Sequence, residues 1–583
     1  MVAEASQRVN PIRRGGVAAS PAAAGLGGPG LYLALPTYVI VVVLAVAPLA
    51  LLIFWSFWRY DPATYWIKPD LSFDAYQTIV SSGRLAVIIK TARIAVTTTA
   101  LALVLAYPIA YFMHRLAGAR LRMLLSLLFL VPFFTSYIVR TFAWRLILGR
   151  LGLVNTALQA LGVIQRPVEW LLFDEFAVQV GLLASYLPFM IFPILLSMTR
   201  IEGSVLEASE DLGASAWQTL RHVVIPLTTP GIFAGSLFVF VMALGSSVEV
   251  QFLGGAAESM IAIIDYGRHA RAELPAGLRH LYAGTGVAHP AAGHRQPISG
   301  SERAVPERVK MTTAQPAADS SRRRQWARRL LLIYAVGVLL FVYVPPTYML
   351  LISFNPGLLP HLPSLSHLSV KWYSILFSEE RMIAAFKASV FTGIATALIT
   401  TVLAVLASLA YLRSVNRSLL FNTVVFPMFV PGVIQGLSLA IVFKLPNIIP
   451  SLWTITAGHI LWALPFAFIV ILTSMSALRG SLIEAAQDLG ASNWQTFRDI
   501  IFPLVSPGIT SAALFAFLLS FNEYSRAYFL VGGQDTLPIY MFGAMNAGTS
   551  PTIYALAGTI LIVSFLGIGA ALLALNVRQR RAA

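Results

Sequence analysis

The polar side chains that could act on a ligand or a partner are few, and most stand in one motif that occurs twice. The first copy comprises Glu207, Ala208, Gly213 and Pro226. The second copy repeats these residue types at the same spacing with Glu484, Ala485, Gly490 and Pro503. Neither copy assembles a catalytic constellation or a set of metal ligands. The motif therefore indicates a contact surface and not a reaction centre.

The order of residue types within the motif predicts a helix, a turn and a second helix. Glu207 and Ala208 open a short helix whose small side chains permit close approach to another surface. Gly213 then allows a sharp turn at a place where a Cβ would clash. A second short helix carries Trp217, and Pro226 marks the entry to the next apolar segment.

A second set of candidates consists of ionisable residues inside apolar segments, which are functional candidates by default. Glu249 stands near the outer end of one segment, and Glu523 stands at a comparable level of its repeat, next to Asn522. For a cationic solute, these three residues would line a passage. The alternative is that the two carboxylates end helices at the interface and reach water. Arg140 and Arg145 are predicted to pair internally or to reach the outer surface.

Several classes of activity are excluded. A phosphate-binding loop requires a Gly-Lys pair, which occurs nowhere in the sequence. ATP hydrolysis must then come from separate subunits, and we expect the chain to bind no cofactor itself. There is no cysteine, and the nine histidines are scattered. We therefore predict no metal site and no catalytic residue.

The elements that position these residues are membrane-spanning helices. The chain is 57% hydrophobic and 11% charged, and its mean hydropathy is +0.75, whereas soluble chains carry about 25% charged residues. Runs of about 20 apolar residues are long enough to span a bilayer. Eleven such spans are predicted: 31–57, 85–112, 123–148, 176–198, 231–253, 330–353, 385–412, 418–443, 452–475, 507–530 and 553–575.

The net charge of +16 does not indicate a nucleic-acid partner, because the basic residues flank the apolar runs. This is the pattern of cytoplasmic loops in the membrane proteins of bacteria. It places the chain in the inner membrane as a multi-pass protein, with residues 1–30 as a cytoplasmic N-terminal tail.

The sequence contains an internal duplication with an offset of 277 residues. Between 207–232 and 484–509, 16 of 26 positions are identical, and a polar loop has no compositional reason to repeat in this way. The predicted fold is an all-α polytopic membrane protein with two homologous halves of about six helices each, at 31–264 and 330–583.

The sixth helix of the first half is missing from this plan. The expected segment, 276–298, contains three His, two Arg and two Pro, which a lipid-exposed helix does not accommodate. The charge rule also requires one more crossing before the basic run at Arg322–Arg329. We interpret 265–329 as a polar linker. It either docks irregularly against protein or arose from a reading-frame shift that fused two neighbouring reading frames, with Met311 as a former start; we favour the frame shift.

The duplicated motif resembles the EAA loop of ABC importer permeases, and the resemblance covers both halves. It implies that two cytoplasmic ATPase subunits dock at these loops, with Glu207 and Glu484 as polar contacts and Gly213 and Gly490 as turns. It also implies an extracytoplasmic solute-binding protein, and transport by alternating access.

Two further stretches resemble a subfamily. Residues 131–155 are similar to the first permease of spermidine/putrescine-type importers, and residues 426–433 and 520–538 are similar to its partner permease. This favours a polyamine as the solute, with iron(III), thiamine, phosphonate and opine as alternatives. Two other readings remain open: a secondary transporter, which would need mid-membrane carboxylates, and a non-functional fusion whose second half alone is complete.

Overall fold

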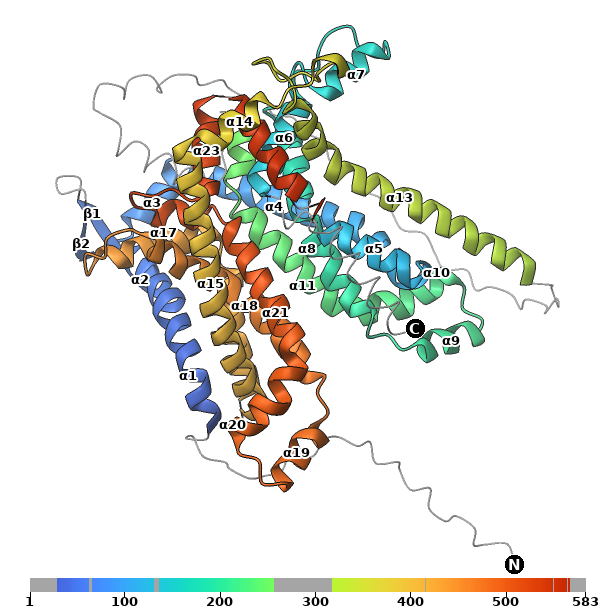
Figure 1. Cartoon of the computed structure of the whole chain (residues 1–583), viewed down its shortest axis with the longest axis vertical. Helices are drawn as coiled ribbons and strands as arrows, with labels where there is room; N and C mark the ends of the chain where they lie inside the picture. Colours follow the sequence, from blue (N-terminus) through green and yellow to red (C-terminus); the bar gives the residue numbers. More distant parts are fainter. Residues whose placement is uncertain are drawn as a thin grey trace, which may run out of the picture.

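The structure is a computed structural model of the whole chain, in which residues 29–61, 66–130, 136–255, 317–414, 416–548, 550–563 and 565–566 are described. Figure 1 shows two bundles of long helices that meet side by side and diverge toward one end. The predicted missing crossing and most of the predicted linker fall within 256–316, outside the described residues.

The first half contains one small antiparallel hairpin and a series of helices. The hairpin pairs β1 (Trp58–Asp61) with β2 (Trp66–Leu71). The helical segments are α1 (Pro29–Val41), η1 (Val42–Val46), α2 (Ala47–Trp55), α3 (Asp74–Ser81), α4 (Arg84–Tyr111), η2 (Phe112–Leu116), α5 (Ala119–Leu130), α6 (Tyr137–Leu148), α7 (Leu153–Ala160), α8 (Glu175–Met198), α9 (Gly203–Asp211), α10 (Ala216–Thr219), η4 (Leu220–Val224), α11 (Ile225–Leu244) and η5 (Val250–Gly254).

The second half repeats this order without a counterpart of the hairpin or of α7 among its described residues. Its segments are α13 (Ala317–Ile352), η7 (Leu365–His367), α14 (Lys371–Ser378), α15 (Glu380–Arg413), α16 (Arg417–Val425), η8 (Phe426–Phe429), α17 (Gly432–Lys444), α18 (Leu452–Ser476), α19 (Gly480–Asp488), α20 (Asn493–Thr496), η9 (Phe497–Ile501), α21 (Phe502–Phe521), α22 (Ala527–Leu530), α23 (Leu537–Ala547) and a last apolar helix, Pro551–Val563.

The prediction of an all-α polytopic membrane protein is confirmed. Within the described residues, eight helices are long and apolar enough to cross a membrane, or nine if one bent pair counts as a single span. α13 begins at Ala317, so the last part of the predicted linker, 317–329, is helical. The last apolar helix, Pro551–Val563, covers the first part of the predicted span at 553–575, and residues 567–575 lie beyond the described residues.

The predicted spans 231–253 and 507–530 are too long at their C-terminal ends, because α11 ends at Leu244 and α21 ends at Phe521. Two further predicted spans are broken in the middle. Residues 123–148 divide between α5 and α6, with 131–135 outside the described residues. Residues 418–443 divide between α16 and α17, whose axes differ by 98°. Pro431 precedes α17 and cannot donate a helical hydrogen bond, so the chain turns there. Gln435 Nε2 donates to the carbonyl of Pro427 (2.6 Å), which also accepts the backbone N–H of Val430 (3.3 Å).

The first helix of each half packs against the other half. α1 contacts α15 and α16, and α2 contacts α17; in Figure 1, α1 lies alongside α15. Two small side chains, Ala34 of α1 and Ala45 of η1, are buried in the core of the second half. Thr37 Oγ1 also donates to the carbonyl of Leu403 (3.1 Å). Such small residues and inter-helix hydrogen bonds are what hold membrane helices together.

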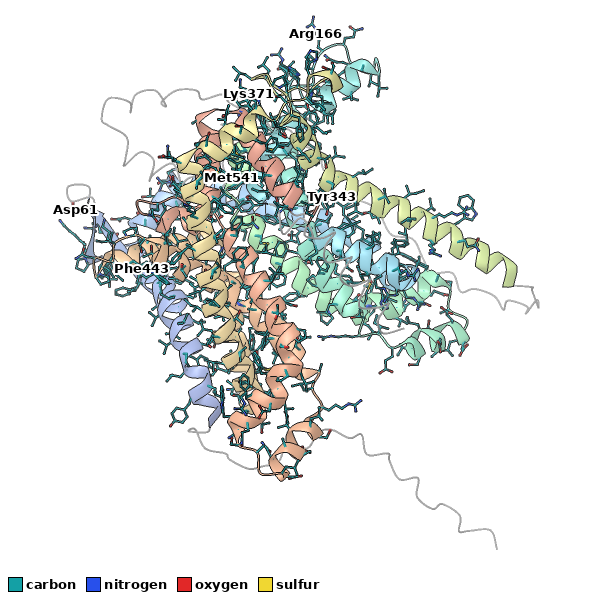
Figure 2. The ribbon with its side chains drawn as sticks, viewed as in Figure 1. Asp61, Arg166, Tyr343, Lys371, Phe443 and Met541 are labelled. Atoms are coloured by element: carbon teal, nitrogen blue, oxygen red, sulfur yellow. The ribbon has the colours of Figure 1, made fainter. Side chains whose placement is uncertain are left out.

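The reciprocal exchange is made by α13, which contacts α4 and α6 of the first half. Tyr334 donates to the carbonyl of Leu105 (3.1 Å), and Tyr343 donates to the carbonyl of Leu128 (2.6 Å). Tyr343, labelled in Figure 2, lies where α13 meets the first bundle. The two halves are thus interlocked as well as covalently joined.

Candidate solute pathway and coupling loops

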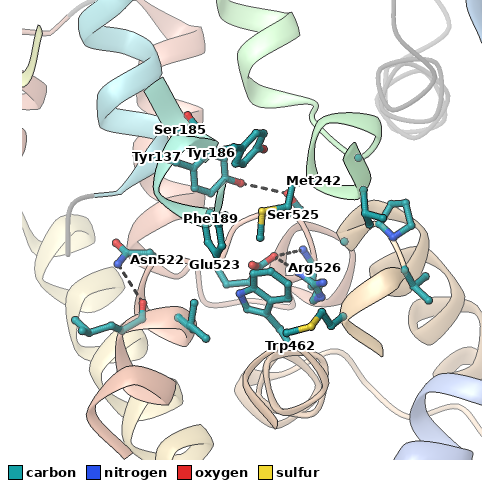
Figure 3. Close-up of a pocket in the computed structure, with 18 of the residues that line it drawn as sticks. Tyr137, Ser185, Tyr186, Phe189, Met242, Trp462, Asn522, Glu523, Ser525 and Arg526 are labelled. Atoms are coloured by element: carbon teal, nitrogen blue, oxygen red, sulfur yellow. Dashed lines mark hydrogen bonds and ion pairs between the residues drawn. The ribbon is translucent and has the colours of Figure 1, made fainter. Parts of the chain in front are cut away.

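A cavity of about 130 Å³ lies between the two halves. Its wall combines helices α6, α8 and α11 of the first half with α17, α18 and α21 of the second half and the segment after α21 (Figure 3). Its polar and aromatic lining residues are Tyr137, Arg140, Ser185, Tyr186, Phe189, Trp462, Asn522, Glu523, Ser525 and Arg526. A site at the interface of two repeats is where transporters of this architecture place their solute.

The most densely bonded group at the cavity is the guanidinium of Arg526. Its Nη1 lies 3.1 Å from Glu523 Oε1, and its Nε donates to Gln435 Oε1 (2.6 Å). The guanidinium carbon stands 4.5 Å from the centre of the Trp462 ring. Glu523 Oε1 also accepts the backbone N–H of Arg526 (3.0 Å). Arginine and glutamate are both buried, so this ion pair is screened little by water.

The carboxylate of Glu249 sits differently. It is 0% exposed, it does not line the cavity, and one of its oxygens accepts a hydrogen bond from Ser246. Arg140 does line the cavity and donates from Nη1 to the carbonyl of Ala184 (3.2 Å). Of the predicted pathway residues, Asn522 and Glu523 therefore face the cavity, while Glu249 lies behind the wall.

The repeat explains the difference between the two acids. The offset of 277 residues pairs Glu249 with Arg526, and it pairs Ser246 with Glu523. Glu523 thus stands one helical turn before the counterpart of Glu249. For residues before α7, the offset that matches the two halves is 295 and not 277. Ser136, which precedes α6, then corresponds to Pro431, which precedes α17, and the two residues have the same backbone geometry. The matched positions around the cavity are then Arg140 with Gln435, Ser185 with Trp462, Ser246 with Glu523 and Glu249 with Arg526.

Sequence reasoning missed three members of this group: Gln435, Trp462 and Arg526. The repeat offset alone would have indicated Arg526, since it places an arginine where the first half has a buried acid. No signal in the sequence indicated Gln435 or Trp462, because both stand in apolar runs. The direction in which Gln435 faces depends on the break before α17, and that of Trp462 depends on how α18 packs.

The duplicated motifs form two helix–turn–helix loops, α9–α10 and α19–α20. Figure 1 shows them at the ends of the two bundles remote from α7 and α14. α9 begins at Gly203, ahead of Glu207 and Ala208, and α19 begins at Gly480, ahead of Glu484 and Ala485. The side chains of these four motif residues are exposed. They are therefore free to meet another protein.

The two turns contain glycine because of their backbone conformation, and not because neighbouring atoms leave no room for a side chain. Gly213 has φ +78° and Gly490 has φ +83°, a left-handed conformation that disfavours side chains. A Cβ at either position would meet no atom within 4 Å. The prediction that a Cβ would clash at these turns is therefore wrong. Glycine is favoured there because the backbone has a positive φ.

Each turn leads into a capped helix that presents apolar side chains to solvent. Ser215 and Gln218 form a capping box, and Ser492 and Gln495 form its counterpart. The exposed fractions of four apolar side chains match in pairs: 87% for Leu212 and 89% for Leu489, and 64% for Trp217 and 63% for Trp494. Exposed apolar side chains that recur at matched positions indicate an interaction surface.

The sequence predicts that Pro226 and Pro503 mark the entry to the next apolar segment. Pro226 and Pro503 lie at the start of α11 and α21, each directly after a turn of π-helix. The backbone N–H of Ile225 bonds to Leu220, and that of Phe502 bonds to Phe497. The helix therefore runs without interruption from the loop into the membrane, and it begins at Ala216 or Asn493. The loop and the membrane-spanning helix are thus joined without a break in the helix.

The two loops differ in their internal bonding. In the first loop, Ser209 Oγ and Thr219 Oγ1 share a buried hydrogen bond (2.8 Å). In the second loop, Ala486 replaces the serine, and Thr496 Oγ1 has no hydrogen-bond partner among the described residues. The first loop is also tied to η2 by an ion pair between Arg115 and Glu210 (3.4 Å).

A polytopic helical protein with a solute-sized cavity between two repeats has the architecture of a membrane transport permease. Residues 99–272 and 397–582 each match the family described as "Binding-protein-dependent transport system inner membrane component". Because these segments cover more than half of the sequence, the chain belongs to this family. It is a bacterial inner-membrane permease of the ABC importer type, with the family domain present twice.

Individual relatives support the assignment. The spermidine/putrescine transport system permease protein PotB of Escherichia coli is 36% identical over 206 residues, which are 35% of this chain and 74% of PotB. Escherichia coli PotC is 26% identical over 236 residues, 40% of this chain and 89% of PotC. The inner membrane ABC transporter permease protein YdcU of the same organism is 32% identical over 215 residues, 35% of this chain and 68% of YdcU.

Proposed function

We propose that this chain forms the whole membrane pathway of an ATP-driven importer, passing a small organic cation of the polyamine class from a binding protein to the cytoplasm. Two ATPase subunits dock at loops α9–α10 and α19–α20 and drive the pathway between its two open states. The observation that carries the proposal is the pair of exposed, matched loops at the ends of both bundles.

The coupling argument rests on how the loops join the membrane helices. Each loop continues through a π turn into a helix, α11 or α21, whose far part lines the cavity. A rigid helix transmits a displacement from one end to the other, and the interface between repeats is the place where such a displacement changes access. ATPase closure at the loops would therefore open or close the cavity.

The solute argument rests on the cavity and on the relatives. Two of the relatives are named as spermidine/putrescine permeases. The cavity offers one carboxylate, Glu523, together with the aromatic side chains of Tyr137, Tyr186, Phe189 and Trp462. Aromatic faces and carboxylates are the groups that recognise organic ammonium ions.

The test is ATP-dependent uptake of spermidine by membranes that contain the complete transporter. Glu484→Lys and Gly490→Asp, with the matched Glu207→Lys and Gly213→Asp, should abolish uptake while the chain still inserts. Glu380→Lys is the control, because it makes the same charge change on an exposed acid at the start of α15, at the opposite end of the second bundle. Normal uptake by the four loop variants would contradict the coupling role.

A further inference from the structure

The surroundings of Arg526 have the composition of a binding site for an organic cation. An aromatic face (Trp462), a carboxylate (Glu523) and an amide oxygen (Gln435) converge on one guanidinium. Each of these groups favours a cation: the ring through its quadrupole, and the two oxygens through charge-assisted hydrogen bonds. Figure 3 shows the guanidinium between the carboxylate and the indole ring.

The backbone of α17 leaves room for this cation. A Cβ at Gly432 would stand 2.9 Å from Nη1 of Arg526 and 3.3 Å from its guanidinium carbon. A Cβ at Gly436 would stand 3.0 Å from the Arg526 Cα. Two glycines one helical turn apart thus make the space that the arginine fills. The site is shaped to its occupant and is not a chance contact.

Only the second half builds such a site. At the matched positions the first half has Tyr137 for Gly432, Ser185 for Trp462 and Ser246 for Glu523. The counterpart of Arg526 is Glu249, which is itself an acid. The duplication supplied the same backbone twice, yet the aromatic face, the carboxylate and the glycine space occur together in one copy.

The site opens onto the solute cavity. Arg526, Glu523, Trp462 and Gly432 all line it, and the cavity continues along Tyr137 and Tyr186 of the first half. Arg140 contributes a second arginine to the wall, whereas Glu249 is buried behind it. A solute in the cavity therefore meets the cation site directly, with the guanidinium already in it.

We propose that Arg526 is a tethered occupant of the solute's own cation site, and that an ammonium group of the transported solute takes its place. This deepens the proposed function, on which it rests, by naming the class of ligand and the residues that hold it. Exchange of one cation for another keeps the buried carboxylate of Glu523 paired throughout.

The tethered cation also links the elements around the cavity. Without solute, the side chain of Arg526 joins α17 and α18 to the segment that follows α21. When the ammonium displaces it, these particular links pass from the arginine to the solute. The solute must compete with an internal cation, so its apparent affinity is lowered by the fraction of time that the site is free.

The test is binding of radiolabelled spermidine and putrescine to the purified full-length chain in lipid nanodiscs. Arg526→Met removes the internal cation, and Gly432→Ala keeps every charge but pushes the guanidinium out of its place. Both should tighten spermidine binding, by about tenfold if the site is free about one tenth of the time in the parent chain. Arg381→Met is the control, since Arg381 pairs with Asp535 on the surface and should leave binding unchanged.

Two further measurements guard against a variant that is merely unstable. Adding Trp462→Leu to Arg526→Met should weaken binding again, because the aromatic face is lost. Spermidine should also raise the melting temperature of Arg526→Met more than that of the parent chain, since it restores a cation beside Glu523. Equal or weaker binding in both Arg526→Met and Gly432→Ala would overturn the proposal.

Binding of succinate that Arg526→Met abolishes would equally overturn the proposal, because the arginine would then be the ligand for an anion. Neither result would touch the coupling role, which is tested by the loop variants and does not depend on the cavity. A failure of the cation site and a failure of the importer mechanism are therefore distinguishable.

Discussion

Position 249 of the first half carries a buried glutamate that accepts a hydrogen bond from Ser246. The matched position of the second half carries Arg526, which pairs with Glu523. The backbones of the two halves follow the same plan, but the charge at this matched position is of opposite sign. A duplicated scaffold of apolar helices is free to keep its packing while each copy specialises its few polar positions, because those positions contribute little to the shape of the bundle.

The largest expected difference between the halves concerns the buried ion pair. Glu523→Gln leaves Arg526 without its carboxylate in a buried site, which should lower the free energy of unfolding by about 3 kcal/mol. The matched change in the first half, Ser246→Ala, removes one neutral donor to Glu249 and should lower it by about 1.5 kcal/mol. Thermal unfolding in detergent measures both, and equal effects would show that the halves do not differ in this way.

The next difference concerns how tightly the helices cross. A Cβ at Gly231 of α11 would meet the backbone carbonyl of Pro193 at 2.5 Å, whereas a Cβ at Gly508 of α21 would meet only the side chain of Ser474. A backbone cannot move aside as a side chain can. We expect Gly231→Ala to destabilise by about 2 kcal/mol and Gly508→Ala by less than about 1 kcal/mol. Unfolding of the two variants side by side tests the order, and the reverse order would refute it.

A third change should reveal no difference at all. Gly213→Ala and Gly490→Ala each force a side chain into the left-handed region with no steric contact, so each should destabilise by about 1 kcal/mol. Limited proteolysis at the two loops is a suitable measurement, because it reports local opening. Unequal sensitivity would mean that the loops differ in more than their internal hydrogen bond.

The smallest effect concerns that hydrogen bond. Ser209→Ala removes it from the first loop and should cost about 1 kcal/mol. Ala486→Ser offers a partner to Thr496 in the second loop and should gain about 0.5 kcal/mol. Hydrogen exchange at the two loops measures both changes. If Ala486→Ser slows exchange in the second loop to the rate of the first, this one bond accounts for the difference between them.

Much of the fold could be predicted from the sequence because it depends on local signals. Apolar length fixed most of the spans, and the repeat of 16 identical positions in 26 located both loops. The two broken spans could not be predicted, because an apolar run has the same composition whether it is straight or turns by 98°. Only Pro431 and the later position of Gln435 explain the turn once the backbone is known.

The candidate site was predicted only in part, for a related reason. Asn522 and Glu523 were found because polar residues are conspicuous in apolar surroundings. Trp462 and Gln435 were not found, because the face of a helix that meets a cavity is decided by tertiary packing. The packing of each first helix against the other half could not be predicted either, since the small residues Ala34 and Ala45 would suit either half equally well.

The packing of α1 against the second half determines when this helix can find its partner during synthesis. Thr37 of α1 and the carbonyl of Leu403 that it contacts are separated by 366 residues. At the usual rate of translation, about 5 to 20 residues per second, α1 waits on the order of 20 to 70 s before its partner exists. α13, by contrast, emerges when α4 and α6 are already in place. During synthesis, the first span of this chain is therefore a helix without its packing partner, and an insertion factor or chaperone that holds such helices can bind it.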